Sequence, residues 1–417
     1  MAEPAQHFDV VVMGTGTAGS TLALALAQAG MRTALVGPAP LDRGDAPTFD
    51  GRAYFIAYGV FRQWRSLGLG ERLSAQAQPV EHILVTDGPG PGASARAPSP
   101  VFLRFDADEL GGAEGEPLGW MLESRHIRAA LTEALEASDV EVIAPAGVMN
   151  IALEAGAAQV ALSDGRILRA RLVVGAEGRR SAVRTAAGIK TFGWGYPQAG
   201  VVATVALERP HEATAHEYFM PGGPLAILPL RGDRASLVWS EQKPAAEALT
   251  SASVEGFEAH LARRFGDLLG RPKLIGARAS HPLGLSVAEH MIATRAALVG
   301  DAAHTVHPVA GQGLNTGLKD VAALAEVIVD AARLGEDWGS EVVLERYARW
   351  RRFDSATLAV ATDLFVRVFS NDDPVLRLAR GAGLALVNRI KPARRFFMQD
   401  AGAALGDTPR LLQGQPL

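Results

Sequence analysis

Three glycine-containing loops carry most of the residues that could do chemistry in this chain. The first is Gly14-x-Gly16-x-x-Gly19, which lies between an expected strand at residues 8–13 and an expected helix at residues 20–29. Glycines at this spacing permit a tight turn, close approach of backbone to a pyrophosphate and close helix–strand packing, and the helix N-terminus favours the anion. The motif alone is weak, but its strand–turn–helix context predicts dinucleotide binding.

One expected part of this motif is missing. An acidic residue that binds the ribose hydroxyls normally ends the second strand, about 20 residues further on. Here that strand ends at Gly37, and the loop that follows contains Asp42, Asp45 and Asp50. These three carboxylates are the candidates for replacing the missing group.

The second loop follows a buried strand expected at residues 172–175. It contains Glu177 and Gly178, and then Arg179 and Arg180. A carboxylate, a glycine and two arginines could serve the phosphates of a dinucleotide. The alternative is an ordinary strand end with a solvated basic loop.

The third loop is the most informative. A strand expected at residues 297–300 ends at Asp301, which can accept hydrogen bonds from sugar-like hydroxyls. The loop then enters a helix, expected at residues 313–334, and its start is the run Gly311, Gln312, Gly313 and Leu314. Backbone N–H groups there are free for a ligand, and the helix N-terminus would stabilise negative charge on a reduced cofactor.

Two histidines in the third loop have a spacing that could suggest a metal. His304 and His307 are three residues apart, but no third ligand is apparent and Pro308 follows directly. We therefore expect no metal.

The elements that position these loops are typical of a large globular protein. The chain has 417 residues, 48% of them hydrophobic and 21% charged, which predicts two or three domains and excludes disorder. The absence of cysteine excludes disulfides, thiolate metal sites and a flavin disulfide reductase. A net charge of −4 argues against nucleic acid as a partner. We find neither a signal peptide nor an uninterrupted apolar span, and expect a cytoplasmic protein.

Further elements follow from local patterns. A helix is expected at residues 123–137, and a hairpin at residues 159–168 turns through Asp164-Gly165. Residues 201–240 read as an antiparallel sheet that belongs to a different domain from the N-terminal strand–helix–strand unit. The chain after residue 341 reads as helices.

The three loops in this order resemble those of the class A flavin monooxygenases, and within them the ubiquinone-biosynthesis hydroxylase family. The segment GDAAHTVHPVAGQGLNTGLKDVAALAEVI at residues 300–328 is similar to the family signature almost throughout. Also similar are Asp50-Gly51-Arg52-Ala53, the helix at 123–131, the hairpin at 223–240 and the C-terminal run at 347–398. The resemblance covers nearly the whole chain.

This resemblance implies an α/β fold like that of para-hydroxybenzoate hydroxylase. A discontinuous Rossmann-like FAD-binding domain would comprise residues 1–75, 118–190 and 281–344. An antiparallel-sheet substrate domain would comprise residues 76–117 and 191–280, and a C-terminal helical region residues 345–417.

The resemblance also assigns roles to residues. Gly14, Gly16 and Gly19 would hold the FAD pyrophosphate, and Asp301 the ribityl chain. Residues 311–314 would face the flavin ring. Further expected cofactor contacts are Arg52, Arg125, Glu177 and Gly178. Glu177 stands where the family has aspartate, and Gly37 where it has an acidic residue.

The implied reaction is hydroxylation of a polyprenylated phenol. NAD(P)H would reduce FAD, O2 would add to give a C4a-hydroperoxyflavin, and one oxygen would pass to the ring in a dry pocket. His304 and His307 are candidates by type for activating the phenol, although a role in ordering the loop is favoured for both.

The substrate resides in a bilayer. The inner face of the membrane and other quinone-biosynthesis proteins are therefore expected partners. Residues 345–395 carry a net charge of +6 and mix arginines with apolar side chains, as an interfacial surface does. Helices with a solvated basic face remain an equal alternative. Two other functions stay open: a hydroxylase of a soluble aromatic, and a non-catalytic flavoprotein subunit, which Glu177, Gly37 and Tyr54 motivate.

Overall fold

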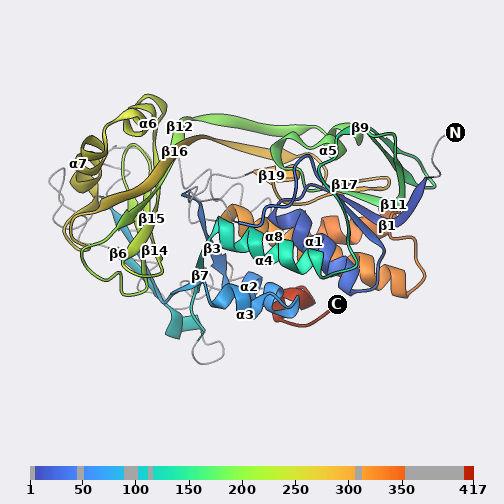
Figure 1. Cartoon of the computed structure of the whole chain (residues 1–417), viewed down its shortest axis with the longest axis horizontal. Coiled ribbons are helices and arrows are strands. Elements are labelled where there is room, and N and C mark those ends of the chain that lie inside the picture. The colour runs from blue at the N-terminus through green and yellow to red at the C-terminus, as the bar shows by residue number, and fades with distance from the viewer. Residues whose placement is uncertain (1–4, 45–50, 89–101, 111–115, 306–311, 353–407) are drawn as a thin grey trace.

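The fold is described from a computed structural model of the chain. It describes residues 5–44, 51–88, 102–110, 116–305, 312–352 and 408–417. Within these residues the chain forms three sheets, surrounded by helices (Figure 1).

The first sheet is built around the N-terminal strand and has eight strands, in the order β17–β18–β11–β1–β2–β8, with β10 and β9 added beside β11. Strands β1, β2, β8, β11 and β18 run parallel, and apolar residues on both of their faces are buried, as is usual for parallel strands. The strands are β1 (Gln6–Met13), β2 (Thr33–Val36), β8 (Glu141–Ile143), β9 (Val148–Leu153), β10 (Ala158–Leu162), β11 (Ile167–Gly175), β17 (Ile292–Ala293) and β18 (Ala296–Leu298).

Helices cover one face of the first sheet, and β9 and β10 with a short helix cover the other. Alternate residues of β1 show the division: Val10 and Val12 pack with the helices, whereas Val11 and Met13 pack with Val183 and the β9–β10 side. The helices on the first face are α1 (Thr17–Gln28), α2 (Tyr58–Ser66), α4 (Ser124–Glu136) and α8 (Gln312–Arg333), and α5 (Ala182–Ala186) lies on the second.

The second sheet also has eight strands, in the order β19–β16–β12–β15–β14–β13–β5–β6. Its outer face is covered by α6 (Lys243–Ser251) and α7 (Val254–Phe265), at the end of the molecule far from α1 and α8 (Figure 1). The strands are β5 (His82–Asp87), β6 (Phe102–Asp106), β12 (Thr191–Ala206), β13 (Thr214–Phe219), β14 (Leu225–Leu230), β15 (Arg234–Gln242), β16 (Lys273–Ala288) and β19 (His304–Thr305).

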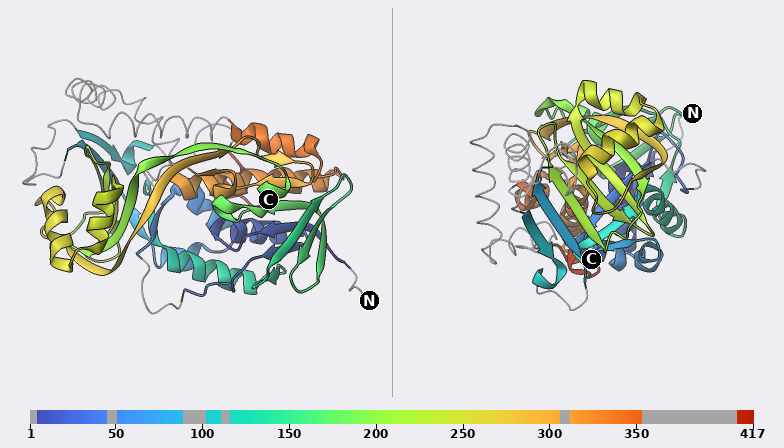
Figure 2. Two further views of the ribbon diagram at one scale, coloured as in Figure 1. Left: turned by 90° about the horizontal axis from the view of Figure 1, so that it is seen from above. Right: turned by 90° about the vertical axis from the view of Figure 1, so that its left-hand side faces the viewer.

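Two long strands join the halves of the molecule. Strands β12 and β16 are each 16 residues long and pair antiparallel from the first sheet's end of the molecule to the helices α6 and α7, as seen from above in Figure 2. A third, smaller sheet, β3–β7–β4, lies between the two large ones; its strands are β3 (Ala53–Ala57), β4 (Gln78–Val80) and β7 (Gly119–Glu123).

The remaining elements are short. They are α3 (Gly70–Ser74) and the 3-10 helices η1 (Ala107–Leu110), η2 (Gly178–Arg180), η3 (Gly300–Ala302) and η5 (Arg410–Gln413). The C-terminal η5 lies beside α2 (Figure 1).

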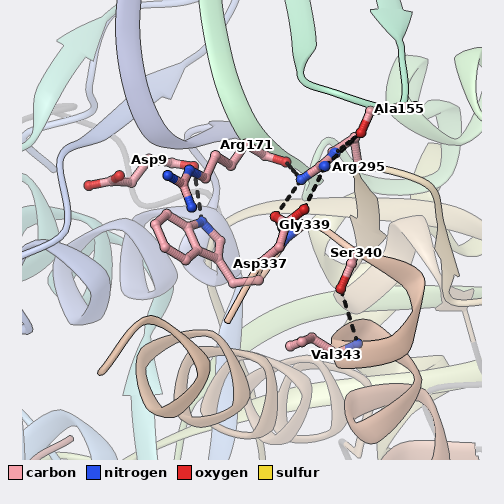
Figure 3. A network of polar contacts seen from close by, with 9 residues as sticks. Asp9, Ala155, Arg171, Arg295, Asp337, Gly339, Ser340 and Val343 are labelled. Carbon is pink, nitrogen blue, oxygen red and sulfur yellow. Dashed lines mark hydrogen bonds and ion pairs between the residues drawn. The ribbon is translucent and has the colours of Figure 1, made fainter. Parts of the chain in front are cut away.

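An ion pair between buried Arg295 and partly exposed Asp337 ties the β17–β18 turn to the segment before residue 341. Both terminal nitrogens of Arg295 bond the carboxylate of Asp337, at 2.5 and 2.6 Å, and Nε and Nη2 also donate to the carbonyl of Ala155 (Figure 3). Gly339 and Arg171 complete the contacts around Arg295. This network fixes β18, whose C-terminal end leads into the third loop.

Most of the expected elements are present, with three differences. The strands expected at 166–168 and 172–175 are one continuous strand, β11. The strand expected at 297–300 ends at Leu298, and Gly300–Ala302 forms a 3-10 turn. Strand β12 begins ten residues before the antiparallel region expected from residue 201. Residues 341–352 are helical, and 353–407 lie outside the described residues. The domain boundaries stay a prediction; β16 crosses the one placed at residue 280.

Candidate functional site

The three glycine-containing loops meet at one edge of the first sheet. In the parallel register Met13 lies beside Val36 and Gly175, and Gly175 lies beside Leu298. The carboxyl ends of β1, β2, β11 and β18 therefore coincide, and the residues that follow each strand face a common space. Ligands of open α/β sheets bind at such an edge.

The first loop has the geometry of a pyrophosphate-binding turn. Gly14 has φ +112°, and a Cβ on it would lie 2.5 Å from the carbonyl oxygen of Ala176, so only glycine fits. A Cβ on Gly19 would overlap the carbonyl oxygen of Gly14. At Gly16, by contrast, a Cβ would meet nothing within 4 Å. Gly16 is the N-cap of α1 and no side chain caps this helix, so its N-terminal N–H groups face open space.

The end of β2 explains why the usual acidic residue is absent. A Cβ on Gly37 would lie 2.6 Å from Oγ1 of Thr15, so the Thr15 side chain takes the room of a side chain at residue 37. Of the candidates for replacing it, Asp42 forms an ion pair with Arg128 at 2.7 Å and accepts the Gly44 N–H at 2.8 Å. Asp45 and Asp50 lie outside the described residues.

The side chain of Glu177, one methylene longer than that of aspartate, forms hydrogen bonds within the protein. One carboxylate oxygen accepts the N–H groups of Ala182 and Val183 at 3.1 Å, and the other accepts the Ser181 hydroxyl at 2.6 Å. These bonds satisfy donors at the start of α5. The Glu177 backbone lies against Gly14, and Gly178, with φ +78°, begins η2. Cofactor binding by Glu177 and Gly178 stays a prediction.

Asp301 is accessible at the same edge. Its side chain is exposed, and loss of part of its hydration raises the pKa of the carboxyl, while the charges of Arg179 and His304 oppose the rise. The preceding Gly300 has φ +60° and lies beside Ala18 in the first turn of α1. Asp301 therefore lies close to the first loop, in position to bind a polyhydroxyl chain.

A buried group of charges supports the third loop from behind. The carboxylate of Asp320 in α8 accepts hydrogen bonds from His304 Nε2 at 2.7 Å, Arg351 Nε at 2.8 Å and the Gly300 N–H at 3.0 Å. Asp320 is fully buried, and burial alone would raise its pKa, but the charges of His304 and Arg351 outweigh burial and hold the pKa below its ordinary value. His304 is thus held in the interior, which supports the loop-ordering role.

The first turn of α8 connects the third loop to the third sheet. Asn315 accepts the Ala57 N–H at 2.9 Å and donates to the Phe55 carbonyl at 2.8 Å, so it pairs with the backbone of β3 as a neighbouring strand would. Gly313 and Leu314 precede it, both partly buried. Gln312 begins the helix, whereas His307 and Gly311 lie outside the described residues.

The two arginines expected near the cofactor lie at the junction of the third sheet and α4. The Arg52 carbonyl accepts the Ser124 N–H at 2.9 Å, and the Arg52 side chain is exposed. Arg125 donates to Glu123 at 2.7 Å, and Glu123 also pairs with Arg234 of β15 at 3.0 Å. Their contact with a cofactor stays a prediction.

The arrangement fits a dinucleotide such as FAD. Gly16 offers an uncapped helix start and space for a pyrophosphate, and Asp301 offers an accessible carboxylate for hydroxyls beside it. The second sheet closes over the other end through the third sheet. A Rossmann-like unit joined in this way to a second sheet is the arrangement that the sequence predicts for a flavoprotein monooxygenase.

Comparison with known proteins gives the family. The family described as "FAD binding domain" matches residues 7–361. The ubiquinone hydroxylase UbiL of Rhodospirillum rubrum is 42% identical over 98% of this chain and 93% of its own. The 3-demethoxyubiquinol 3-hydroxylase of Escherichia coli is 33% identical over 95% and 98%. The p-nitrophenol 4-monooxygenase PnpA of Pseudomonas putida has the same fold, with a TM-score of 0.78 at 20% identity over 96% of this chain and 99% of its own.

The chain belongs to the FAD-dependent hydroxylases of ubiquinone biosynthesis, a family of class A flavoprotein monooxygenases. The predictions of family, fold, enzyme class and FAD as cofactor are confirmed, and use of NAD(P)H is typical of the class.

Three residues that support the site were not singled out from the sequence. They are Asn315, Asp320 and Arg351. Asp320 directly precedes the apolar stretch 321–325 of α8, and a carboxylate on the buried face of a helix is a signal that it must be paired. Its partners, however, lie 16 and 31 residues away, so their identity needed the fold.

Proposed function

We propose that this protein hydroxylates the ring of a polyprenylated phenol in ubiquinone biosynthesis, using FAD, NAD(P)H and O2. The observation that carries the proposal is end-to-end similarity to ubiquinone-biosynthesis hydroxylases, at 42% and 33% identity, in a chain whose loops fit FAD.

The residues divide the work between holding the cofactor and enclosing the substrate. We expect Gly14, Gly16 and the start of α1 to hold the pyrophosphate, and Asp301 to bind the ribityl hydroxyls. FAD, when bound, would supply the redox chemistry: acceptance of electrons from NAD(P)H and transfer of one oxygen atom of O2 to the substrate. Asp320 and His304 position the loop that carries Asp301.

The inner face of the second sheet suits an apolar substrate. Where this face meets the third sheet, Ala215 and Leu230 pack with Phe55 and Met121 in an apolar cluster. An apolar sheet face beside a reactive flavin keeps water away from it, and it accepts a prenylated ring better than a charged aromatic acid.

Access to a membrane-resident substrate is a separate part of the proposal. In the described part of the chain no helix is long and apolar enough to cross a membrane. We propose that residues 345–395, with their net charge of +6, contact the inner membrane face and other quinone-biosynthesis proteins. Most of this segment lies outside the described residues.

Vesicle binding tests the membrane contact. Replacing Arg377, Arg380, Arg389 and Arg394 by glutamine removes four charges, each worth about 1 kcal/mol near an anionic surface, so co-sedimentation with anionic vesicles is expected to fall strongly. Neutral vesicles are the control. Unchanged co-sedimentation of the variant would contradict the contact.

A reconstituted assay tests the reaction. FAD-loaded protein, NAD(P)H and isotopically heavy O2 are incubated with a prenylated phenol and, separately, with soluble phenols. Incorporation of one heavy oxygen atom into the prenylated ring is the expected result. Labelling of the soluble phenols alone would establish the soluble-aromatic alternative, and a protein that binds FAD but labels neither would establish the non-catalytic one.

A further inference from the structure

Strand β13 places a glutamate on the inner face of the second sheet. Side chains alternate along a strand. Tyr218 packs on the outer face with Phe257 of α7, whereas Ala215 packs on the inner face with Phe55 of β3. Glu217 is two residues from Ala215 and so lies on the same face of the strand. Its carboxyl is therefore directed inward, toward the third sheet.

Phe55 connects this position to the third loop. Its carbonyl accepts the Asn315 side chain at the start of α8, and its ring packs in the cluster that contains Ala215. Glu217 is therefore two residues along β13 from Ala215, whose side chain packs in the same cluster as Phe55.

The surroundings of Glu217 are apolar. Its cross-strand neighbours are Ala226 on β14 and Val85 on β5, and the residue is only 9% exposed. In the described part of the chain its carboxyl has no hydrogen-bond or ion-pair partner. A buried carboxyl without a partner costs stability, so a structural reason for keeping it is missing.

Other titratable groups near β13 are placed elsewhere. On the inner face, Asp87 of β5 lies opposite Phe219, two residues beyond Glu217, and Glu123 of β7 is paired with Arg125 and Arg234. His216 and Tyr218 face outward, on the side of α6 and α7. Among the described groups none forms an ion pair with Glu217, so burial alone governs its ionisation.

Burial raises the pKa of Glu217 to about 8. A phenol has an ordinary pKa of about 10, so the two groups differ by about two units, whereas an exposed glutamate near 4.3 would differ by about six. A base whose pKa approaches that of its substrate accepts the proton more readily.

We propose that the carboxylate of Glu217 binds the hydroxyl of the phenol substrate and accepts its proton during hydroxylation. This proposal rests on the function proposed above, because it needs a phenol on the inner face of the second sheet.

The proton transfer is balanced within the site. The phenol O–H bond breaks, the proton passes to a carboxylate oxygen of Glu217, and the electron pair remains on the phenol oxygen. From there it increases the electron density at the ring carbons that receive the oxygen atom. The carboxylic acid returns the proton to the phenolate oxygen as the hydroxylated product leaves.

The pH profile of kcat/KM is the first test. For the native protein kcat/KM is expected to rise with pH and to level off above about pH 8, because only the carboxylate accepts the proton. Glu217→Gln, which has the same shape, is expected to lower kcat by roughly 10²- to 10⁴-fold and to abolish this rise. His216→Gln, on the opposite face of the same strand, is the matched control and keeps the native profile.

Two readouts do not depend on turnover. Addition of a short-chain alkylphenol is expected to shift an infrared band of a protonated carboxyl in the native protein, and Glu217→Gln lacks this band. The unfolded carboxyl has a pKa of about 4.3, so between about pH 4 and 8 the native state binds the extra proton and stability falls as pH rises. Glu217→Gln removes this fall, so its Tm advantage grows with pH.

The outcomes separate this proposal from the proposed function. A native protein that hydroxylates the prenylated phenol, beside a Glu217→Gln variant with native kcat and native pH profile, overturns the role of Glu217 alone. An infrared band that is present but unmoved by the phenol also overturns it. A native protein that hydroxylates no phenol contradicts the proposed function instead.

Discussion

Thr15 and Gly37 occupy each other's space at the edge of the first sheet. The Thr15 side chain lies where a Cβ on Gly37 would be, with Oγ1 2.6 Å from that position. Related dinucleotide sites use an acidic side chain at the end of this strand for the ribose hydroxyls. In this chain a residue in the first loop excludes such a side chain, so the ribose must be bound differently.

Gly37→Asp is therefore expected to weaken the protein rather than improve FAD binding. The new side chain overlaps Thr15 and forces the first loop to move, at a cost of about 1–3 kcal/mol. Thermal unfolding and the ratio of FAD to protein measure the effect. Thr15→Gly combined with Gly37→Asp removes the overlap and should restore stability; if the single variant binds FAD as tightly as the native protein, the steric explanation is wrong.

Asp320→Asn is expected to be among the most damaging single changes. It removes the buried carboxylate charge that Arg351 and His304 both bond, and removal of one partner from a buried ion pair typically costs about 3–5 kcal/mol. The loop carrying Asp301 should loosen, with loss of FAD. Asp337→Asn is the control, because its partner Arg295 also bonds two carbonyls and Asp337 is 42% exposed (Figure 3). Equal loss of Tm in both variants would contradict the importance of the buried group.

The same carboxylate predicts a loss of stability in acid. The pKa of Asp320 is lower in the folded than in the unfolded protein, so its contribution is present above the unfolded value of about 3.9 and lost as pH falls below it. Native Tm should fall steeply below about pH 4, and Asp320→Asn should show a shallower fall. Identical slopes for the two proteins would show that other carboxylates govern acid unfolding.

Asp301→Ala is expected to lose FAD while the protein stays folded. The exposed carboxylate contributes little to folding stability. Loss of a charged hydrogen-bonding group weakens FAD binding by roughly 10- to 100-fold. Flavin absorbance per protein, with Asp164→Ala in a distant hairpin turn as control, measures this. A variant that retains stoichiometric flavin would remove Asp301 from the cofactor site.

The loops could be predicted from the sequence because local chemistry determines them. Gly14 and Gly300 stand out because each glycine directly follows a run of buried apolar residues, and Asp301 stands out because its carboxylate lies at a strand end. Contacts between distant segments could not be predicted in this way. Nothing local shows that Thr15 fills the space at Gly37, or that Arg351 reaches Asp320.

Glu217 shows a second limit of sequence reasoning. Its strand contains His216, Glu217 and Tyr218 in succession, so polarity does not reveal which face is inward. Only the packing of Ala215 and Tyr218 on opposite sides determines that Glu217 lies on the inner face of the second sheet.

The central claim is that this protein adds a hydroxyl group to a prenylated ring during ubiquinone biosynthesis. Mass spectrometry of the quinone-pool lipids in cells lacking the gene tests it most directly. The expected result is an accumulated polyprenyl phenol that lacks one oxygen atom, and its structure would identify the ring position. An unchanged quinone pool, in cells that have no second hydroxylase of this family, would contradict the claim.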